Sequence, residues 1–200
     1  LPKLRCNLGI SGYTECSNPG SLASQYTWLK SVWFSRAASN DTALGNLKPF
    51  SFFCLVEDNP LFCNAAKVAA YSELSRWQTG GQIPSEGSNL LGRVSDMAIF
   101  FDWMYSSLTP TERMDFMPYL ANGTLTHFNR QGQRAQLLPW NPISDYNAFP
   151  FSFYGEGYND TLAFLGANES YYWFVNSYIP VLGELYEGGC TRGYAGVRMS

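Results

Sequence analysis

The chain has 200 residues, of which 46% are hydrophobic, 16% aromatic and only 14% charged, and its formal net charge is −3. This composition indicates a folded protein, because a disordered chain lacks the apolar residues that a core requires. Lys and Arg form no cluster, which argues against nucleic-acid and anionic-membrane partners, and no apolar run approaches the roughly 20 residues of a membrane span.

The first part of the chain changes character at Ser21. Residues 1–20 contain turn-forming residues without a helical period, so we expect an irregular N-terminal arm. Over residues 21–38, apolar residues recur at a spacing of three or four, which predicts a helix with one apolar stripe: Leu22, Tyr26, Leu29, Val32 and Trp33. A second helix is predicted over 43–56, where Pro49 either introduces a kink or marks the true start.

Asp58-Asn59-Pro60 is a helix-start signal, because a polar cap precedes a proline at the first helical position. The helix that follows, over 61–77, carries small residues that allow a neighbouring helix to approach closely: Ala65, Ala66, Ala69 and Ala70. A loop is expected at 78–88.

Residues 90–105 are apolar on nearly all sides of a helix, which predicts an element buried between neighbours. Ser106 and Ser107 end it. Thr109-Pro110-Thr111-Glu112 then forms a capping box, which predicts a helix from residue 110 to about residue 128, with Pro118 as a point of disturbance.

Residues 129–158 form a long loop rich in aromatic residues, glycine and proline, and long structured loops are often functional. A helix is predicted over 158–165 and ended by Gly166, and another over 169–186 contains Pro180. Strand-like alternation is missing, so the sequence predicts an all-α protein built of helical hairpins. We expect a helical domain at 21–187 between irregular arms at 1–20 and 188–200.

The five cysteines indicate disulfides better than a metal site, because the sequence has no CxxC pair and only one histidine. We therefore expect no metal and no cofactor. The short spacings favour the pairs Cys6–Cys16 and Cys54–Cys63, with Cys190 left over; the alternative is free buried thiols.

Asn-X-Ser/Thr sequons are a second indication of the compartment. They occur at Asn40, Asn122, Asn159 and Asn168. Sequons beside plausible disulfides favour an oxidising, glycosylating compartment, so we predict a secreted, extracellular protein.

Two stretches resemble the (α/α) toroid of heparinase II/III-like and alginate-lyase-like polysaccharide lyases. They are "VEDNPLFCNAAKVAAYSELSRW" and "LLGRVSDMAIFFDWMYSSLTPTER", and "DWMYSSLTP" at 102–110 is the most specific part. The resemblance implies an incomplete helical toroid and an acidic polysaccharide as partner. It also implies β-elimination, in which a base removes a proton, an Asn or His neutralises the sugar carboxylate and a Tyr protonates the leaving oxygen.

The resemblance also implies candidate catalytic residues. Asn147, beside Tyr146, falls near the family's asparagine, and Trp140-Asn141 is the alternative match. Neither alignment supplies the family's histidine, and His127 matches no motif. Tyr194 is the candidate acid and base, with Arg192 lowering its pKa by proximity, although Cys190 and Arg192 stand where the family commonly has Tyr and Glu.

Sugar binding has its own candidates. Trp140, Tyr154 and Tyr158 are candidates for stacking on sugar rings, with packing of the loop as the alternative. Arg93 is a candidate partner for a sugar carboxylate, with an ion pair to Asp96 or Glu86 as the alternative.

Two functions stay open at this point. The first is a secreted lyase-like protein that cleaves or binds acidic polysaccharide. The second is a non-catalytic extracellular glycoprotein with a scaffolding or self-assembling role, which the missing histidine favours.

Overall fold

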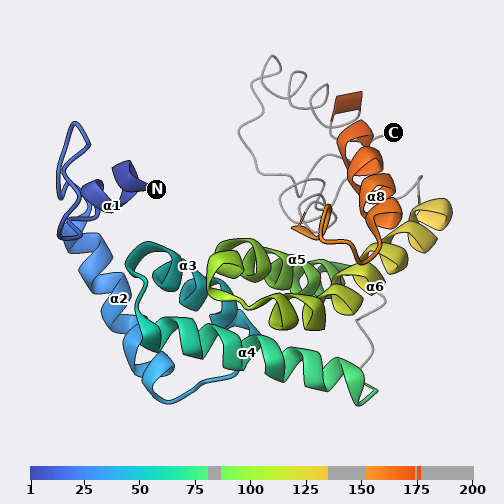
Figure 1. The fold of residues 1–200 in the computed structure, drawn as a ribbon, viewed down its shortest axis with the longest axis horizontal. Coiled ribbons are helices and arrows are strands. Elements are labelled where there is room, and N and C mark those ends of the chain that lie inside the picture. Colours follow the sequence, from blue (N-terminus) through green and yellow to red (C-terminus); the bar gives the residue numbers. More distant parts are fainter. Residues whose placement is uncertain (81–86, 135–151, 174, 177–200) are drawn as a thin grey trace. The chain divides into compact units, whose positions relative to one another are not determined.

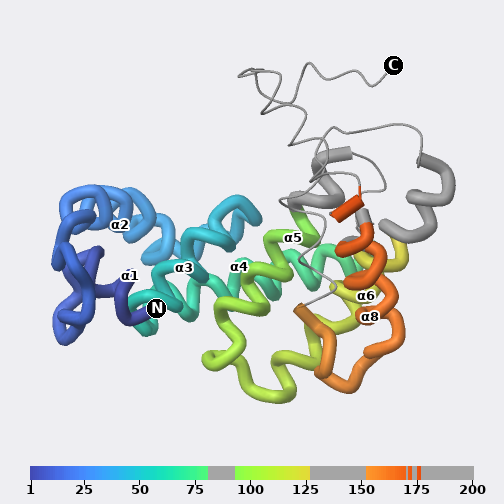
Figure 2. The backbone as a smooth tube through the Cα atoms, turned by 90° about the horizontal axis from the view of Figure 1, so that it is seen from above, coloured from blue at the N-terminus to red at the C-terminus, as the bar shows by residue number. Residues whose placement is uncertain are grey.

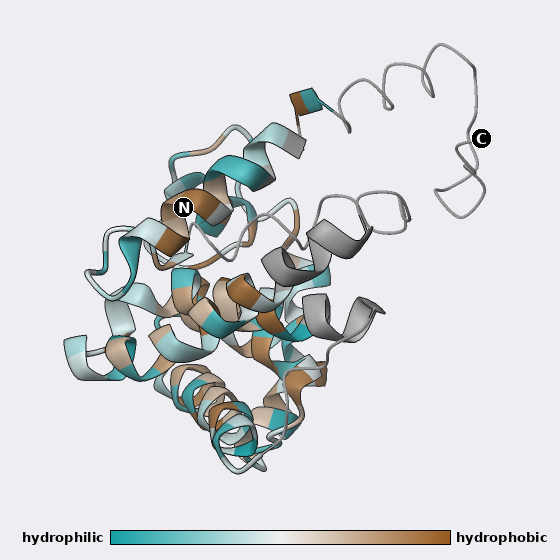
Figure 3. Ribbon diagram, turned by 90° about the vertical axis from the view of Figure 1, so that its right-hand side faces the viewer, coloured by the Kyte–Doolittle hydropathy of each residue, from teal (hydrophilic) through white to brown (hydrophobic). Residues whose placement is uncertain are grey.

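The computed structural model describes residues 1–80, 87–134, 152–173 and 175–176. Within them every regular element is helical, which confirms the predicted all-α class (Figure 1). The elements are α1 (Pro2–Asn7), α2 (Ala23–Ala38), η1 (Leu44–Asn46), α3 (Leu47–Glu57), α4 (Pro60–Gln78), α5 (Gly87–Met104), η2 (Tyr105–Ser107), α6 (Pro110–Arg134) and α8 (Asp160–Trp173). The coloured helices in Figure 3 carry both hydrophobic and hydrophilic residues.

The chain divides into two compact units. The first contains residues 1–80 and 100–109, and the second contains residues 81–99 and 110–200. The helix α5 therefore contributes its last residues to the first unit and the rest to the second.

The first unit is built on the hairpin of α3 and α4, which lie side by side in Figures 1 and 2. Asp58 ends α3 in the left-handed conformation, with φ at 55°, and the Asn59 side chain accepts a hydrogen bond of 3.0 Å from the backbone N–H of Leu61. Pro60 is the first residue of α4, so the predicted start signal is confirmed. The four predicted small residues of α4 are all buried: Ala65, Ala66, Ala69 and Ala70.

Aromatic rings fill the space beside this hairpin. Phe50, Phe53 and Phe62 are fully buried, and the rings of Phe53 and Phe62 stack with their centroids 4.7 Å apart. Pro49 lies in the first turn of α3, where a missing N–H has no intrahelical partner to lose, so it marks the start of the helix and does not kink it.

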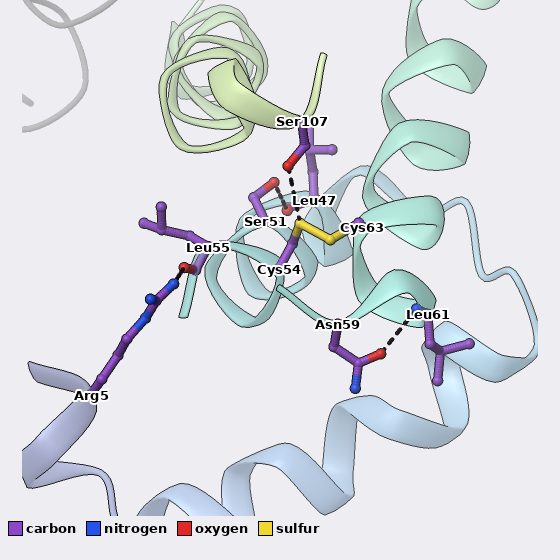
Figure 4. Close-up of a disulfide and its surroundings, with 9 residues drawn as sticks. All are labelled: Arg5, Leu47, Ser51, Cys54, Leu55, Asn59, Leu61, Cys63 and Ser107. Carbon is purple, nitrogen blue, oxygen red and sulfur yellow. Dashed lines mark hydrogen bonds between the residues drawn. A yellow bond between two sulfur atoms is a disulfide. The ribbon is translucent and has the colours of Figure 1, made fainter. Parts of the chain in front are cut away.

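Both predicted disulfides are present. Cys54 of α3 is bonded to Cys63 of α4, and Ser107 lies beside this bond (Figure 4). Cys6 is bonded to Cys16, and Cys190 lies outside the described residues. These bonds exclude free thiols at all four positions.

The N-terminal arm is less irregular than predicted, because Pro2–Asn7 forms α1. A helix of six residues is too short to show a period in the sequence, and Pro2 fits its first turn. The arm also contacts α3, since the Arg5 guanidinium donates a hydrogen bond of 2.8 Å to the Leu55 carbonyl (Figure 4).

α2 packs on α3 and α4, but the predicted apolar stripe is only partly buried. Tyr26 is buried, whereas Leu22, Leu29 and Val32 are exposed. The helix contacts its neighbours through one edge of the stripe, and the Tyr26 hydroxyl fixes that edge by donating a 2.8 Å hydrogen bond to Glu57.

The prediction of a buried helix at 90–105 is confirmed for most described apolar side chains of α5, whereas Asp102 and Tyr105, the first residue of η2, are exposed. Phe100, Phe101 and Met104 are fully buried in the first unit, and Trp103 is half-buried with its ring 6.1 Å from that of Phe52. Val94 and Met97 are buried in the second unit.

The second unit contains α6 and α8, which pack against each other. Both differ from their predicted bounds. α6 continues through Pro118 as far as Arg134, and α8 continues through Gly166 as far as Trp173. A glycine inside a helix costs only about 1 kcal/mol relative to alanine. Gly166 is buried, so packing of α8 offsets that cost. The predicted features at 81–86, 135–151 and 177–200, Pro180 among them, lie outside the described residues.

Candidate functional site

Six of the predicted site residues lie outside the described part of the chain: Tyr146, Asn147, Tyr194, Arg192, Trp140 and Asn141. The structure therefore places three of the nine candidates for catalysis and sugar binding, which are Tyr154, Tyr158 and Arg93. His127 belongs to α6.

Arg93 is half-buried in α5 and already has an interaction partner, as Asp96 does. It is not an unpaired cation waiting for a sugar carboxylate. Its candidacy for carboxylate binding stays a prediction without structural support.

Tyr154 lies at a pocket of about 300 Å³ beside α8. Its lining residues within the described part of the chain are Tyr154, Phe164, Ala167, Asn168 and Tyr171. The rings of Tyr154 and Phe164 have centroids 6.3 Å apart and an interplanar angle of 40°. The aromatic walls are open to solvent, with Tyr154, Phe164 and Tyr171 exposed by 54%, 55% and 62%.

The helical period explains why several residues of α8 line this pocket together. Phe164, Asn168 and Tyr171 are spaced by four and three residues, so their side chains share one face of the helix. α8 also packs against α6. Its buried residues include Leu162, Ala163 and Ala167, of which two are alanines.

The turn before α8 holds Tyr154 in place. Phe153 is fully buried, which anchors the turn, while its neighbour Tyr154 points outward. The Asp160 carboxylate accepts a hydrogen bond of 3.0 Å from the backbone N–H of Gly155, so the turn folds back onto the first turn of the helix. Gly155 has a φ of 86°, a backbone conformation that favours glycine.

Tyr158 is exposed by 43% but does not line the pocket. The pocket therefore combines one residue that the sequence singled out for sugar stacking, Tyr154, with others that it missed in this role: Phe164, Ala167 and Tyr171. The signal that could have found them is the spacing Phe164-x3-Asn168-x2-Tyr171 directly after an aromatic turn.

The pocket offers stacking surfaces and hydrogen-bonding groups. Among its described lining residues the polar groups are the two tyrosine hydroxyls and the amide of Asn168. A site of this kind can hold a ligand that is apolar on its faces and polar at its edges, because aromatic rings supply a large apolar surface with a polar handle.

Two groups in the first unit have pKa values shifted by their surroundings. Burial raises the pKa of Tyr26, and its hydrogen bond to the Glu57 carboxylate raises this pKa further. The backbone N–H of Ala43 and the side chain of Asn46 hold the pKa of Asp41 below its ordinary value. Glu57 also accepts a hydrogen bond of 2.7 Å from Lys30, so this cluster ties α2 to the end of α3.

The four asparagines of the sequons are all exposed, as attachment of a glycan requires. Asn40 follows α2 in the left-handed conformation, with φ at 50°. Asn159 caps α8, because its side-chain oxygen accepts a 3.1 Å hydrogen bond from the backbone N–H of Leu162, and its amide nitrogen is not used for that bond. Asn122 and Asn168 lie inside helices, and Asn168 is the one that lines the pocket.

Searches of the described residues give two further findings. No group of three or more His, Cys, Asp or Glu residues could hold a metal ion there. In the same part of the chain, no helix has the length and hydropathy that crossing a membrane requires.

No protein-family model, no curated protein and no solved structure matches this chain. The resemblance to the toroid lyases therefore depends on the motif at 102–110 and on the order of the helices.

Proposed function

We propose that this protein is a secreted, polysaccharide-lyase-like protein that binds polysaccharide at the aromatic pocket beside α8. The observation that carries the proposal is the pocket itself, in which Tyr154, Phe164 and Tyr171 present exposed rings around a volume of about 300 Å³. The C–H face of a pyranose ring is apolar and its hydroxyls lie at the edge. The pocket has the matching distribution, with rings on its walls and Asn168 among them.

Three observations support the wider parts of the proposal. Successive helices in the described residues support the helical-hairpin layout of an (α/α) toroid. The two disulfides and the exposed sequon asparagines support secretion, because both belong to an oxidising, glycosylating compartment. The motif at 102–110 supports the lyase relationship.

Acidic polysaccharide is the partner class that the lyase resemblance implies. The described pocket residues include no cation, so they support stacking on sugar rings more directly than binding of a carboxylate. Cleavage by β-elimination would depend on Tyr194 and Asn147, with help from Arg192 and Tyr146. The described residues therefore support polysaccharide binding more directly than cleavage.

The test is binding of the secreted protein, in a Ser170→Ala background that leaves Asn168 without a glycan, to alginate, heparin and chondroitin sulfate, with neutral dextran as the uncharged comparison. The variants are Tyr154→Ala and Tyr171→Ala, and the control is Tyr158→Ala, which removes an exposed tyrosine that does not line the pocket. A stacked aromatic contact is worth about 0.5–1.5 kcal/mol, so each pocket variant should bind about 2- to 10-fold more weakly, and the control should bind as the wild type does.

Equal binding by the wild type and both pocket variants would show that the pocket is not the polysaccharide-binding site. Tight binding of dextran alone would reject the acidic partner class and keep the pocket. Absorbance of the unsaturated product, followed in the same samples, tests cleavage separately.

A second candidate function is favoured by the exposed face of α2. Trp28 is 68% exposed, and Leu29 and Val32 on the same side of the helix are also exposed. An apolar surface of this kind is typical of association with another protein, which supports the scaffolding role. Light scattering of the wild type and of the double variant Trp28→Ser, Val32→Ser tests it, and a strictly monomeric wild type would count against self-assembly.

A further inference from the structure

We propose that the N-glycan attached to Asn168 folds back onto the aromatic pocket and competes there with polysaccharide. The inference rests on the proposed function, since it needs a secreted protein and a pocket that accepts sugar. It adds a regulatory element to that site, because the glycosylated and unglycosylated forms of the chain would then differ in affinity for polysaccharide.

Asn168 is both the acceptor of a sequon, Asn168-Glu169-Ser170, and part of the pocket wall. Phe164 lies one turn before it and Tyr171 one turn after it on the same face of α8. A sugar bonded to the amide nitrogen of Asn168 therefore starts between two rings that are more than half exposed. The first sugar of an N-glycan, N-acetylglucosamine, carries an apolar ring face and an acetyl methyl group that suit such walls.

The other mid-helix sequon provides a comparison within the chain. Asn122 of α6 is also exposed, but the residues at the equivalent positions, four before and three after it, are Pro118 and Leu125. A glycan at Asn122 thus has the same helical attachment without aromatic walls. The two sites share an exposed asparagine inside a helix and differ in the aromatic residues beside it.

The short tether makes docking favourable even for a weak contact. A ligand held by a short linker has an effective concentration in the millimolar range, so a contact too weak to matter between separate molecules becomes occupied. A pocket of about 300 Å³ is at the small end of ligand sites, so a docked sugar and an external sugar would exclude each other.

The experiment uses the glycoprotein made by a secretory host, with its N-acetyl groups labelled with ¹³C. Site-specific mass spectrometry first measures occupancy at Asn168. Ser170→Ala removes this glycan while keeping Asn168 in the pocket wall, and Asn122→Gln removes the comparison glycan, so the signals lost in each variant assign the acetyl methyl resonances of that glycan. We expect the Asn168 acetyl methyl to be shifted upfield by the ring currents, and Tyr171→Ala to abolish the shift. The Asn122 methyl should resonate as in a free glycan.

Polysaccharide affinity is the second measurement. Because an intramolecular competitor at millimolar effective concentration weakens binding several-fold, Ser170→Ala should bind polysaccharide about 2- to 10-fold more tightly than the wild type. Asn122→Gln should not change the affinity.

The outcomes separate this inference from the proposed function. An unmodified Asn168, or an acetyl methyl that resonates like that of Asn122, overturns the docking, whether the pocket is then empty or covered by another segment or a second copy. A shifted methyl in a protein whose Ser170→Ala variant binds no polysaccharide supports the docking and rejects polysaccharide binding. Tighter binding by Ser170→Ala together with a shifted methyl supports both.

Discussion

The α3–α4 hairpin and the helix α8 use the same kind of residue in opposite ways. In the hairpin, Phe50, Phe53 and Phe62 are fully buried, and the rings of Phe53 and Phe62 stack on each other. In α8, Phe164 and Tyr171 are more than half exposed. Aromatic content therefore does not decide which part of this chain is core. The difference lies in which side chains each helix buries against the helix that it packs on.

α4 carries alanines together with Phe62 on its buried side, so backbones approach closely and rings fill what is left. α8 buries mainly small residues against α6, and its large rings are left for the solvent side. Burial of a Phe side chain contributes roughly 1.5–3 kcal/mol and burial of an alanine much less. The hairpin thus gains stability from its buried rings, whereas the exposed rings of Phe164 and Tyr171 can contact a ligand.

The largest expected effect comes from removing one ring from each region. Phe53→Ala should lower the free energy of unfolding by about 3–5 kcal/mol, because it leaves a cavity beside Phe62. Phe164→Ala removes an exposed ring and should change it by less than about 0.5 kcal/mol. Urea unfolding followed by circular dichroism measures both. Similar losses in the two variants would contradict the contrast between core rings and surface rings.

The disulfide of the hairpin should contribute the next largest amount. Replacing Cys54 and Cys63 together by alanine should cost about 2–4 kcal/mol, because the bond restricts the unfolded chain, and the short separation of 9 residues places the expected cost toward the lower end of that range. A Cys190→Ala background prevents exchange with that cysteine, and the pair Cys6→Ala, Cys16→Ala is the matched comparison with a similar spacing. Thermal unfolding of the oxidised proteins reports the difference. An unchanged midpoint in the Cys54, Cys63 variant would show that packing alone holds the hairpin.

The second unit has its own close contact, at Gly123 of α6. A Cβ added there would lie 2.6 Å from one methyl carbon of Val94, so Gly123→Ala should destabilise the protein by about 1–3 kcal/mol through overpacking. Val94→Ala combined with Gly123→Ala should restore part of the loss, and Gly45→Ala, where nothing lies within 4 Å, is the control. A stabilising effect of Gly123→Ala, as helix propensity alone would give, would contradict this packing.

The smallest expected effect concerns pH. Because the pKa of Tyr26 is raised in the folded state, the unfolded state loses this proton first as the pH increases. The resulting stability is fully present below the ordinary tyrosine pKa of about 10 and is lost at higher pH. Tyr26→Phe should cost about 1 kcal/mol at neutral pH by deleting the hydrogen bond to Glu57.

The comparison of Tyr26→Phe with the wild type isolates the contribution of Tyr26, because every other residue is the same in both proteins. Above pH 10 the stability of Tyr26→Phe should fall less steeply than that of the wild type. Parallel pH profiles in urea unfolding would exclude an ionisation penalty at this position.

Local signals in the sequence predicted much of the fold. Asn59-Pro60 and Thr109-Pro110 mark the starts of α4 and α6, because capping and proline geometry act within one turn. The two disulfides were predictable from short spacings. Such features depend on residues close in sequence, so no knowledge of the neighbours in space was needed.

Features set by neighbours in space were predicted less well. The stop at Gly166 was wrong, because packing of α8 outweighs the weak helix propensity of glycine. The apolar stripe of α2 was predicted to face one way as a whole, but its burial depends on how much of it α3 and α4 reach, and Leu22 and Val32 stay exposed. Of the pocket, sequence reasoning selected Tyr154 for sugar stacking, since the other walls depend on which face of α8 meets α6.

The left-handed Asp58 between α3 and α4 has a consequence for cleavage by proteases. It is exposed and lies within the stretch that the Cys54–Cys63 bond encloses. A protease that cuts the backbone at this turn would leave two fragments still joined through sulfur, with every stacked ring in place. Nicked molecules should therefore stay covalently joined until a reductant cleaves the Cys54–Cys63 bond.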